Sequence, residues 1–327
     1  MSKRILKWSS LVALALVLLL AACGPTPTAE KEPVKVALLL YGPLADTGWN
    51  ATAYQGLLDA ENELGVEVAV SEDVPVPDIE AVMRDYASQD YNLIIGHSFP
   101  FGEPAMIVAP DFPDTFFVVT NGYVSATNVA SFGPKEVEAN YLGGVLAAKL
   151  TKSGKVGEVA GVKLPNLIAN DHALLMGAQS VSPDIQFTFS YVGSWGDPAK
   201  GKELALALMQ DGVDVIIEAG AASGLGTLEA CAEQDVTVIS YISRESDAAP
   251  KQMVAELLPN YRAMIKHEIE LYLNGQLEGK IYRPDLASGL LDLFMTDAVP
   301  ADARAAVEAA KQDIIAGKLV VPEIFEE

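Results

Sequence analysis

The chain has 327 residues and a formal net charge of −22 at pH 7, from 22 Lys and Arg against 44 Asp and Glu. Such an acidic chain is repelled by nucleic acid phosphates and by anionic lipid headgroups, which excludes nucleic acid as a partner. Three histidines and two cysteines form no Cys/His cluster, so neither a metal site nor another cofactor is expected.

Residues 1–22 have the pattern of a signal peptide. A basic start precedes ten apolar residues, Leu11–Leu20, which are too few to span a bilayer and fit a cleaved leader. The run ends in Leu20-Ala21-Ala22-Cys23, which resembles the lipobox of bacterial lipoproteins. We expect lipidation at Cys23, a stalk over 23–33 and anchoring at the extracytoplasmic face of the cell membrane. The alternative is ordinary cleavage beside a chance cysteine. Loss of the three cations in the leader takes the net charge from −22 to about −25.

Residues 34–130 are predicted to form a first α/β lobe. Short apolar runs alternate with helical patterns along this segment. We expect a helix over 50–64 and strands over 34–40, 66–70, 93–96 and 115–119. Continuous Val, Ile and Leu runs separated by helices indicate a parallel sheet that is covered on both faces.

Residues 131–256 repeat the pattern and are predicted to form a second lobe. We expect strands over 155–160, 185–190, 213–218 and 236–240, and helices over 136–150, 166–181, 198–211 and 225–233. The later segments 259–274 and 301–315 have no strand series of their own. We therefore expect about 257–280 to return to the first lobe and about 281–327 to the second. Two such lobes form a clamshell whose cleft lies at the carboxyl ends of the strands.

The loop after the first strand carries a candidate set of ligand contacts. It reads Tyr41-Gly42-Pro43-Leu44-Ala45-Asp46-Thr47-Gly48-Trp49-Asn50 and has no dinucleotide-binding G-x-G-x-x-G. We predict that Asp46, Trp49 and Asn50 face the ligand. As alternatives, Asp46 or Thr47 caps the following helix, and Trp49 packs at the lobe edge.

The corresponding loop of the second lobe carries the only other tryptophan outside the leader. Trp195 follows a predicted strand, and Asp197-Pro198 behind it reads as a helix N-cap and first turn. Two aromatic rings on opposing walls can hold a flat heterocycle, and stacking of a base contributes about 1–3 kcal/mol. We therefore predict a sandwich by Trp49 and Trp195, with two core tryptophans as the alternative.

Two other strand exits offer polar groups. His97 and Ser98 end a first-lobe strand, and Gly220 and Gly224 lie in a glycine-rich segment after a second-lobe strand. We predict ligand contacts at all four, because glycine permits close approach of the backbone. A satisfied structural histidine and a plain tight turn are the alternatives. The sequence holds no nucleophile elbow and no Walker motif, which favours a binding protein over an enzyme.

Several longer motifs resemble the basic membrane protein (BMP) family of substrate-binding lipoproteins, which bind purine nucleosides or related bases. The resemblance covers Val34 to Leu319. The motifs that carry it are Asp46-Thr47-Gly48-Trp49, Tyr141-Leu142-Gly143-Gly144, Gly177-Ala178-Gln179-Ser180-Val181 and Ser194-Trp195-Gly196-Asp197-Pro198. It implies a type I periplasmic-binding-protein fold that closes by a hinge, with Asp46, Trp49 and Trp195 in the cleft. It further implies a monomer that delivers its ligand to ABC permease subunits.

The resemblance leaves the choice of ligand open. Nucleoside-binding members carry an Asp after the strand that corresponds to 236–240, whereas this chain reads Tyr241-Ile242-Ser243-Arg244 there, which favours a free base. The segment from Gly220 to Gly226 is more similar to the nucleoside-binding branch. Two alternatives remain for the function: presentation of the ligand to a membrane sensor, and binding of a non-purine solute by the same clamshell.

Overall fold

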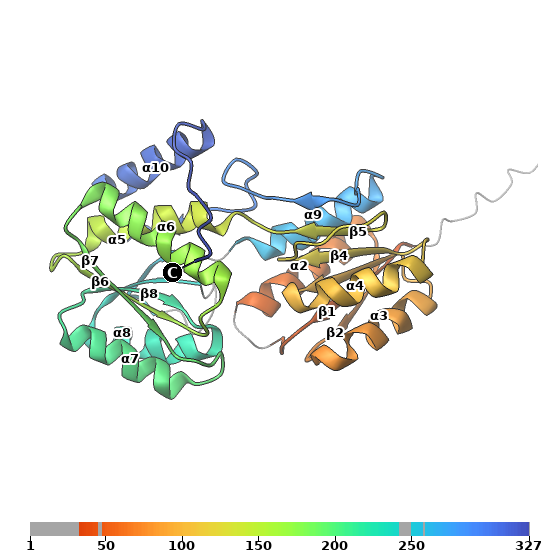
Figure 1. Ribbon diagram of the computed structural model, residues 1–327, viewed down its shortest axis with the longest axis horizontal. Helices are drawn as coiled ribbons and strands as arrows, with labels where there is room; N and C mark the ends of the chain where they lie inside the picture. Colours follow the sequence, from red (N-terminus) through yellow and green to blue (C-terminus); the bar gives the residue numbers. More distant parts are fainter. Residues whose placement is uncertain (1–32, 45–47, 242–249, 258, 327) are drawn as a thin grey trace, which may run out of the picture. The chain divides into compact units, whose positions relative to one another are not determined.

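The computed structural model describes residues 33–44, 48–241, 250–257 and 259–326, and all of these except Pro33 belong to one compact unit, Val34–Glu327. In this part the strands form two six-stranded sheets, and helices flank each sheet (Figure 1). Two mainly parallel sheets in one chain confirm the predicted α/β class. The predicted leader and Cys23 lie outside the described residues.

The first sheet has the strand order β11-β5-β4-β3-β1-β2, and its neighbouring strands are all parallel. Its strands are β1 (Lys35–Leu40), β2 (Glu67–Ser71), β3 (Leu93–His97), β4 (Phe116–Thr120), β5 (Val129–Phe132) and β11 (Ile281–Tyr282). Alternate residues of β1 enter two separate cores. One core includes α2 (Trp49–Leu64) and α9 (Tyr261–Leu273), and the other includes α3 (Ile79–Ser88) and α4 (Gly102–Val108).

The second sheet has the order β12-β10-β9-β8-β6-β7. Its strands are β6 (Lys155–Ala160), β7 (Gln186–Tyr191), β8 (Val215–Ala219), β9 (Thr237–Ser240), β10 (Met253–Glu256) and β12 (Phe294–Met295), of which only β12 pairs antiparallel. One core includes α5 (Glu136–Leu150), α6 (Pro165–Val181) and α10 (Ala301–Ile315). The other includes α7 (Pro198–Gln210) and α8 (Gly224–Gln234).

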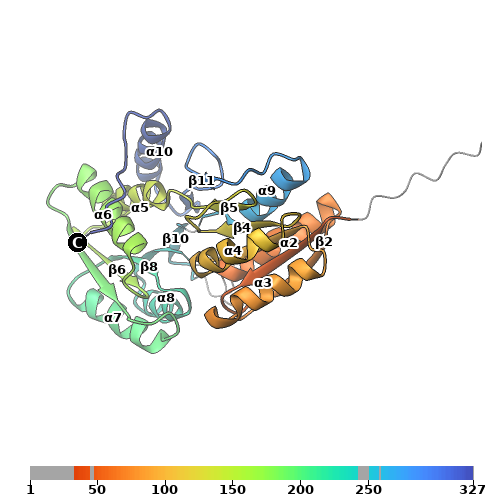
Figure 2. The ribbon, with the colours of Figure 1, turned by 45° about the vertical axis from the view of Figure 1, so that its right-hand side comes forward.

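The long elements lie close to their predicted positions, and the short ones were missed. β5 and β10 have four residues each, and β11 and β12 have two each, so none carries a long apolar run. Figure 2 shows β11 beside β5. The predicted N-cap of α7 is confirmed, because the Asp197 carboxylate accepts a hydrogen bond from the Lys200 amide at 3.0 Å.

The described chain passes from one sheet to the other three times, after β5, after β10 and after β11. The first and third crossings run together, since the Gly133 amide donates to the Tyr282 carbonyl at 3.0 Å and the Lys135 amide donates to the Pro284 carbonyl at 2.8 Å. The second joins them where the Asn260 amide donates to the Leu290 carbonyl at 3.0 Å. The lobe limits expected near residues 130 and 280 fall at β5 and β11, which pair in the first sheet.

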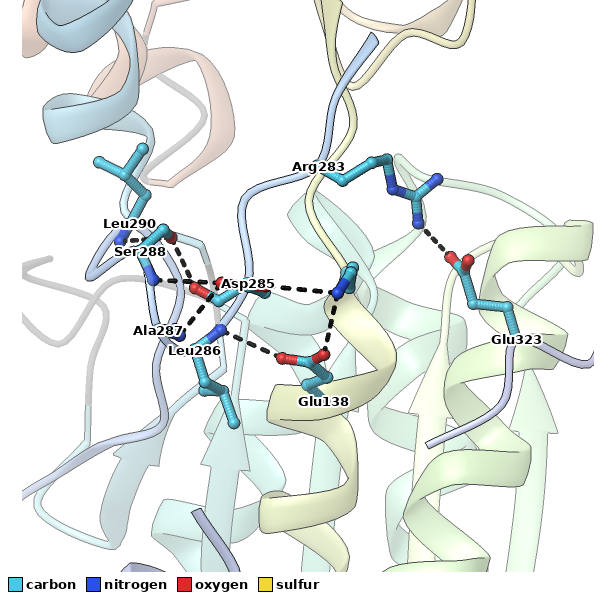
Figure 3. Close-up of polar contacts among 9 residues, drawn as sticks. Glu138, Arg283, Asp285, Leu286, Ala287, Ser288, Leu290 and Glu323 are labelled. Carbon is cyan, nitrogen blue, oxygen red and sulfur yellow. Dashed lines mark hydrogen bonds and ion pairs between the residues drawn. The ribbon is translucent and has the colours of Figure 1, made fainter. Parts of the chain in front are cut away.

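Charged side chains connect the crossings to the second lobe (Figure 3). The Lys135 ammonium lies 3.3 Å from Asp285 and 3.5 Å from Glu138. The Glu138 carboxylate also accepts from the Leu286 amide at 3.1 Å, and Arg283 pairs with Glu323 of the C-terminal segment. Within the described ranges, no helix combines the length and the apolar character that a membrane span requires.

Candidate functional site

Trp49 belongs to an aromatic cluster at the carboxyl edge of the first sheet. It begins α2, and its ring centroid lies 4.7 Å from that of His97 at the end of β3. Tyr261, the first residue of α9, lies 4.5 Å from Trp49 and 5.0 Å from His97. Sequence reasoning missed Tyr261, because α9 reaches this edge only after the chain has passed through the second lobe.

The His97 side chain is fully buried and hydrogen-bonds to the backbone carbonyl of Trp49. Its Nε2 lies 3.1 Å from the Trp49 carbonyl oxygen, and a carbonyl can only accept, so Nε2 carries the proton. Nδ1 is then a buried acceptor without a partner in the described part of the chain. Burial lowers the pKa of His97 to about 3, so the ring is neutral near pH 7. This geometry assigns His97 a positioning role; its predicted ligand contact stays a prediction.

The other predicted residues of the first lobe lie in varied surroundings. Asn50 is buried in the first turn of α2, close to Gly42. Ser98 is partly exposed and has φ +154°, a backbone conformation that residues other than glycine rarely adopt. Asp46 lies outside the described residues, as does Thr47, and Gly48 stands at the N-cap position of α2.

Trp195 lies on the loop after β7, which packs against the segments that follow β6 and β8. Its ring covers Gly161, directly after β6, where a Cβ would come within 2.2 Å of the ring. Ser223, before α8, donates from its amide to the Trp195 carbonyl at 3.0 Å and from its hydroxyl to the Ser194 carbonyl at 2.8 Å. The indole is nevertheless 40% exposed. Trp195 is therefore held by its backbone and presents part of its ring to solvent.

Gly220 and Gly224 enclose a buried carboxyl group. The Gly220 amide donates to Glu218 Oε1 at 2.6 Å, and a Cβ on Gly224 would lie 1.7 Å from the same oxygen. The Glu218 carboxyl group leaves no room for a side chain at Gly224 and bonds the backbone at Gly220, which accounts for glycine at both positions. Ligand contact by their amides remains a prediction.

Polar side chains link the aromatic cluster of the first lobe to the second lobe. The Tyr261 hydroxyl lies 3.4 Å from Glu136 at the start of α5, and Asn170 on α6 donates to the same carboxyl group at 3.0 Å. The Tyr241 hydroxyl, after β9, donates to Asn140 at 2.7 Å. Burial raises the pKa of Glu136. Tyr241 packs against the cores of both sheets.

A pair of neighbouring acidic side chains lies in the second lobe. Glu158 and Asp171 lie close together, and burial raises the pKa of both carboxyl groups. Asp171 also accepts a hydrogen bond from Tyr191. No group of three or more His, Cys, Asp or Glu suited to a metal ion occurs among the residues that the structure describes. The arrangement offers ring stacking and hydrogen bonding.

The structure assembles the predicted residues into two local sets. Trp49, Asn50, His97 and Ser98 lie at the carboxyl ends of β1 and β3, and Trp195, Gly220 and Gly224 lie at those of β7 and β8. Gly161 could have been suspected from its position behind a predicted strand. An open depression beside α10, lined by residues such as Met295 and Arg304, includes none of the predicted residues.

Comparison with known proteins gives a family match over nearly the whole described chain. The model of the Bmp family, described as "ABC transporter substrate-binding protein PnrA-like", matches residues 33–324. The transcriptional activator protein Med of Bacillus subtilis is 27% identical over 280 residues, which are 85% of this chain and 87% of that protein.

Two further relatives are named for their ligands. A purine-binding protein of Brucella abortus is 27% identical over 292 residues, 88% of this chain and 83% of that protein. A nucleoside-binding ABC transporter protein of Lactococcus lactis is 27% identical over 351 aligned positions, 98% of this chain and 99% of that protein.

A solved structure shares the fold. An ABC transporter solute-binding protein of Aeropyrum pernix superposes with a TM-score of 0.78 at 24% identity, over 89% of this chain and 94% of that chain. With the two parallel sheets, this match confirms the predicted type I periplasmic-binding-protein fold.

Proposed function

The chain belongs to the Bmp family of ABC transporter substrate-binding proteins, and from this premise we propose that it captures a purine base or nucleoside and delivers it to an importer. The membership confirms the family predicted from the sequence motifs. It is a family of binding proteins rather than of enzymes. The main observation in support of a purine-like ligand is the pair of tryptophans, Trp49 and Trp195, one after a strand of each sheet.

The placement of the two indoles supports a flat ring as ligand. Each is fixed by its backbone, Trp49 through His97 and Trp195 through Ser223. Rings fixed in advance lose little entropy on binding. The ligand names of the relatives from Brucella abortus and Lactococcus lactis favour the same class.

The proposal includes export and anchoring. The protein is lipidated at Cys23 after removal of residues 1–22, remains at the extracytoplasmic face and acts as a monomer. Its partners are the permease and ATPase subunits of the importer. Transcriptional activation, which the name of the Bacillus subtilis relative gives for that protein, is not part of the proposal, because a net charge of −22 opposes contact with nucleic acid phosphates.

Calorimetry tests the ligand class. Since Val34–Glu327 forms one compact unit, protein that starts at Glu30 is suitable. It is titrated with adenine, adenosine, guanosine and inosine, and with glucose as a non-purine control. We expect a dissociation constant well below millimolar for at least one purine and none measurable for glucose. The absence of binding to all four purines would defeat the proposal.

Replacement of Trp195 tests the stacking contact. Trp195→Ala removes one face of the predicted sandwich and should weaken purine binding about 5- to 150-fold, which corresponds to the usual stacking free energy. Trp195→Phe keeps an aromatic ring and is the matched control, with most of the affinity retained. Equal affinity in the wild type and Trp195→Ala would remove this residue from the site.

A further inference from the structure

The exposed aromatic side chains of the described residues are unevenly distributed. Five are exposed: Tyr41, Phe99, Tyr123, Trp195 and Phe325. The first four follow the carboxyl ends of β1, β3, β4 and β7 in turn, and the fifth lies in the C-terminal segment. Ligands of open α/β sheets bind at the carboxyl ends of strands. The pattern therefore concentrates exposed rings where a ligand is expected.

Three of these rings follow neighbouring strands of the first sheet. Leu40 of β1 pairs with His97 of β3, and His97 pairs with Thr120 of β4. The loops that carry Tyr41, Phe99 and Tyr123 hence begin at the same edge of the sheet. Tyr123 has a partner, because the Arg283 guanidinium lies over its ring at 5.4 Å. Tyr41 is 49% exposed and Phe99 is 66% exposed.

Phe99 is the most exposed of the aromatic rings, and the local backbone presents it. A single 3-10 turn, Phe99–Phe101, follows directly: the Phe101 amide donates to the Ser98 carbonyl at 3.2 Å, and the Phe101 ring is fully buried against Gly96. Ser98 precedes this turn at φ +154° and ψ +159°, a backbone region of raised energy that recurs at ligand sites. His97 on its other side contacts Trp49. Phe99 thus lies two residues after His97, which contacts the ring of Trp49.

We propose that Phe99 is a third aromatic contact of the ligand, in addition to Trp49 and Trp195. It contacts the bound purine from the first lobe, beside the face that Trp49 stacks on. This assignment rests on the proposed function, because the occupant is the same ligand. An apolar ring that is two-thirds exposed contributes nothing to either core of the first sheet, and a heteroaromatic ligand removes it from water.

The affinity of variants tests the assignment on protein that starts at Glu30. Phe99→Ala should weaken binding of the best purine about 5- to 150-fold and leave the melting temperature of the free protein unchanged. Phe99→Tyr should restore most of the affinity. Met106→Ala is the control, because Met106 is a 37% exposed apolar side chain in the second turn of α4 rather than in a loop after a strand, and it should bind as the wild type.

Wild-type affinity of Phe99→Ala, together with weakened binding by Trp195→Ala, would overturn the assignment and leave the proposed function intact. A wild type that binds no purine would overturn both.

Thiol labelling provides a second readout. Protein from Glu30 lacks Cys23, and Cys231 is buried with its pKa raised to about 12, so it reacts slowly. Saturating purine should slow labelling of Phe99→Cys at least several-fold and leave Met106→Cys unaffected. Equal labelling rates of Phe99→Cys with and without purine would contradict the assignment.

Discussion

At the scale of single residues, His97 illustrates how burial decides chemistry. An exposed histidine titrates near pH 6.5, whereas this ring is enclosed by Trp49 and Tyr261 and its pKa is lowered to about 3. The neutral form is thereby retained, and its Nε2 proton is kept for the Trp49 carbonyl. The residue that fixes the predicted stacking ring is therefore insensitive to pH in the physiological range.

The lowered pKa predicts a pH dependence of stability. A group whose pKa is lower in the folded state stabilises the fold above its unfolded pKa and loses this contribution as the pH falls. Between pH 7 and pH 4, His97 should account for about 3 kcal/mol of lost unfolding free energy. Chemical denaturation at several pH values measures this loss.

The matched variant is His97→Gln, which keeps an N–H donor and cannot be protonated in this range. Its unfolding free energy should fall less steeply with acid than that of the wild type. His267→Gln, at a partly exposed position of α9, should follow the wild-type profile. Parallel profiles of His97→Gln and the wild type would show that His97 does not control acid stability.

At the scale of elements, two helices of the second lobe approach so closely that only glycine fits. A Cβ on Gly144 of α5 would lie 2.0 Å from the Leu174 carbonyl oxygen, and one on Gly177 of α6 would lie 2.0 Å from the Tyr141 carbonyl oxygen. Both glycines belong to motifs that suggested the family. Their presence thus has a packing cause, which single-sequence patterns do not reveal.

This close contact predicts a strong effect of adding a methyl group. Gly144→Ala should lower the unfolding free energy by about 3 kcal/mol, at the upper end of overpacking costs, because the backbones must separate. Gly196→Ala is the control, since nothing lies within 4 Å of its added Cβ, and it should change stability by less than about 0.5 kcal/mol. Denaturant unfolding measures both, and similar losses in the two variants would contradict the packing explanation.

At the scale of the whole molecule, the three crossings carry the connection between the sheets. They are joined to one another by backbone hydrogen bonds and to α5 by Lys135 and Glu138 (Figure 3). Tyr241 adds a packed contact with the cores of both sheets. A ligand that contacts both lobes should therefore stabilise the folded form in which the two lobes are held together.

Ligand binding should therefore raise global stability. A purine at 100 times its dissociation constant should add about 2.7 kcal/mol to the unfolding free energy, because it binds only the folded form. Thermal unfolding with and without ligand measures the shift, and glucose at the same concentration should give none. A melting temperature that does not move at saturating purine would contradict binding to the native fold.

Local sequence patterns were sufficient to predict the repeated strands and helices and the N-cap at Asp197. These features depend on residues close together in the chain, whose burial period and turn chemistry are local. The short strands β5 and β11 carry no such local signal, because pairing with their neighbours forms them.

The groups that hold the predicted ligand residues come from distant parts of the chain and are seen only in the folded protein. Tyr261 reaches Trp49 from a distant part of the chain, Gly161 lies beneath Trp195, and Glu218 fills the space at Gly224. Such contacts depend on the register of strands and on the course of the crossings. Side chains from separate elements meet there for reasons that no local pattern contains.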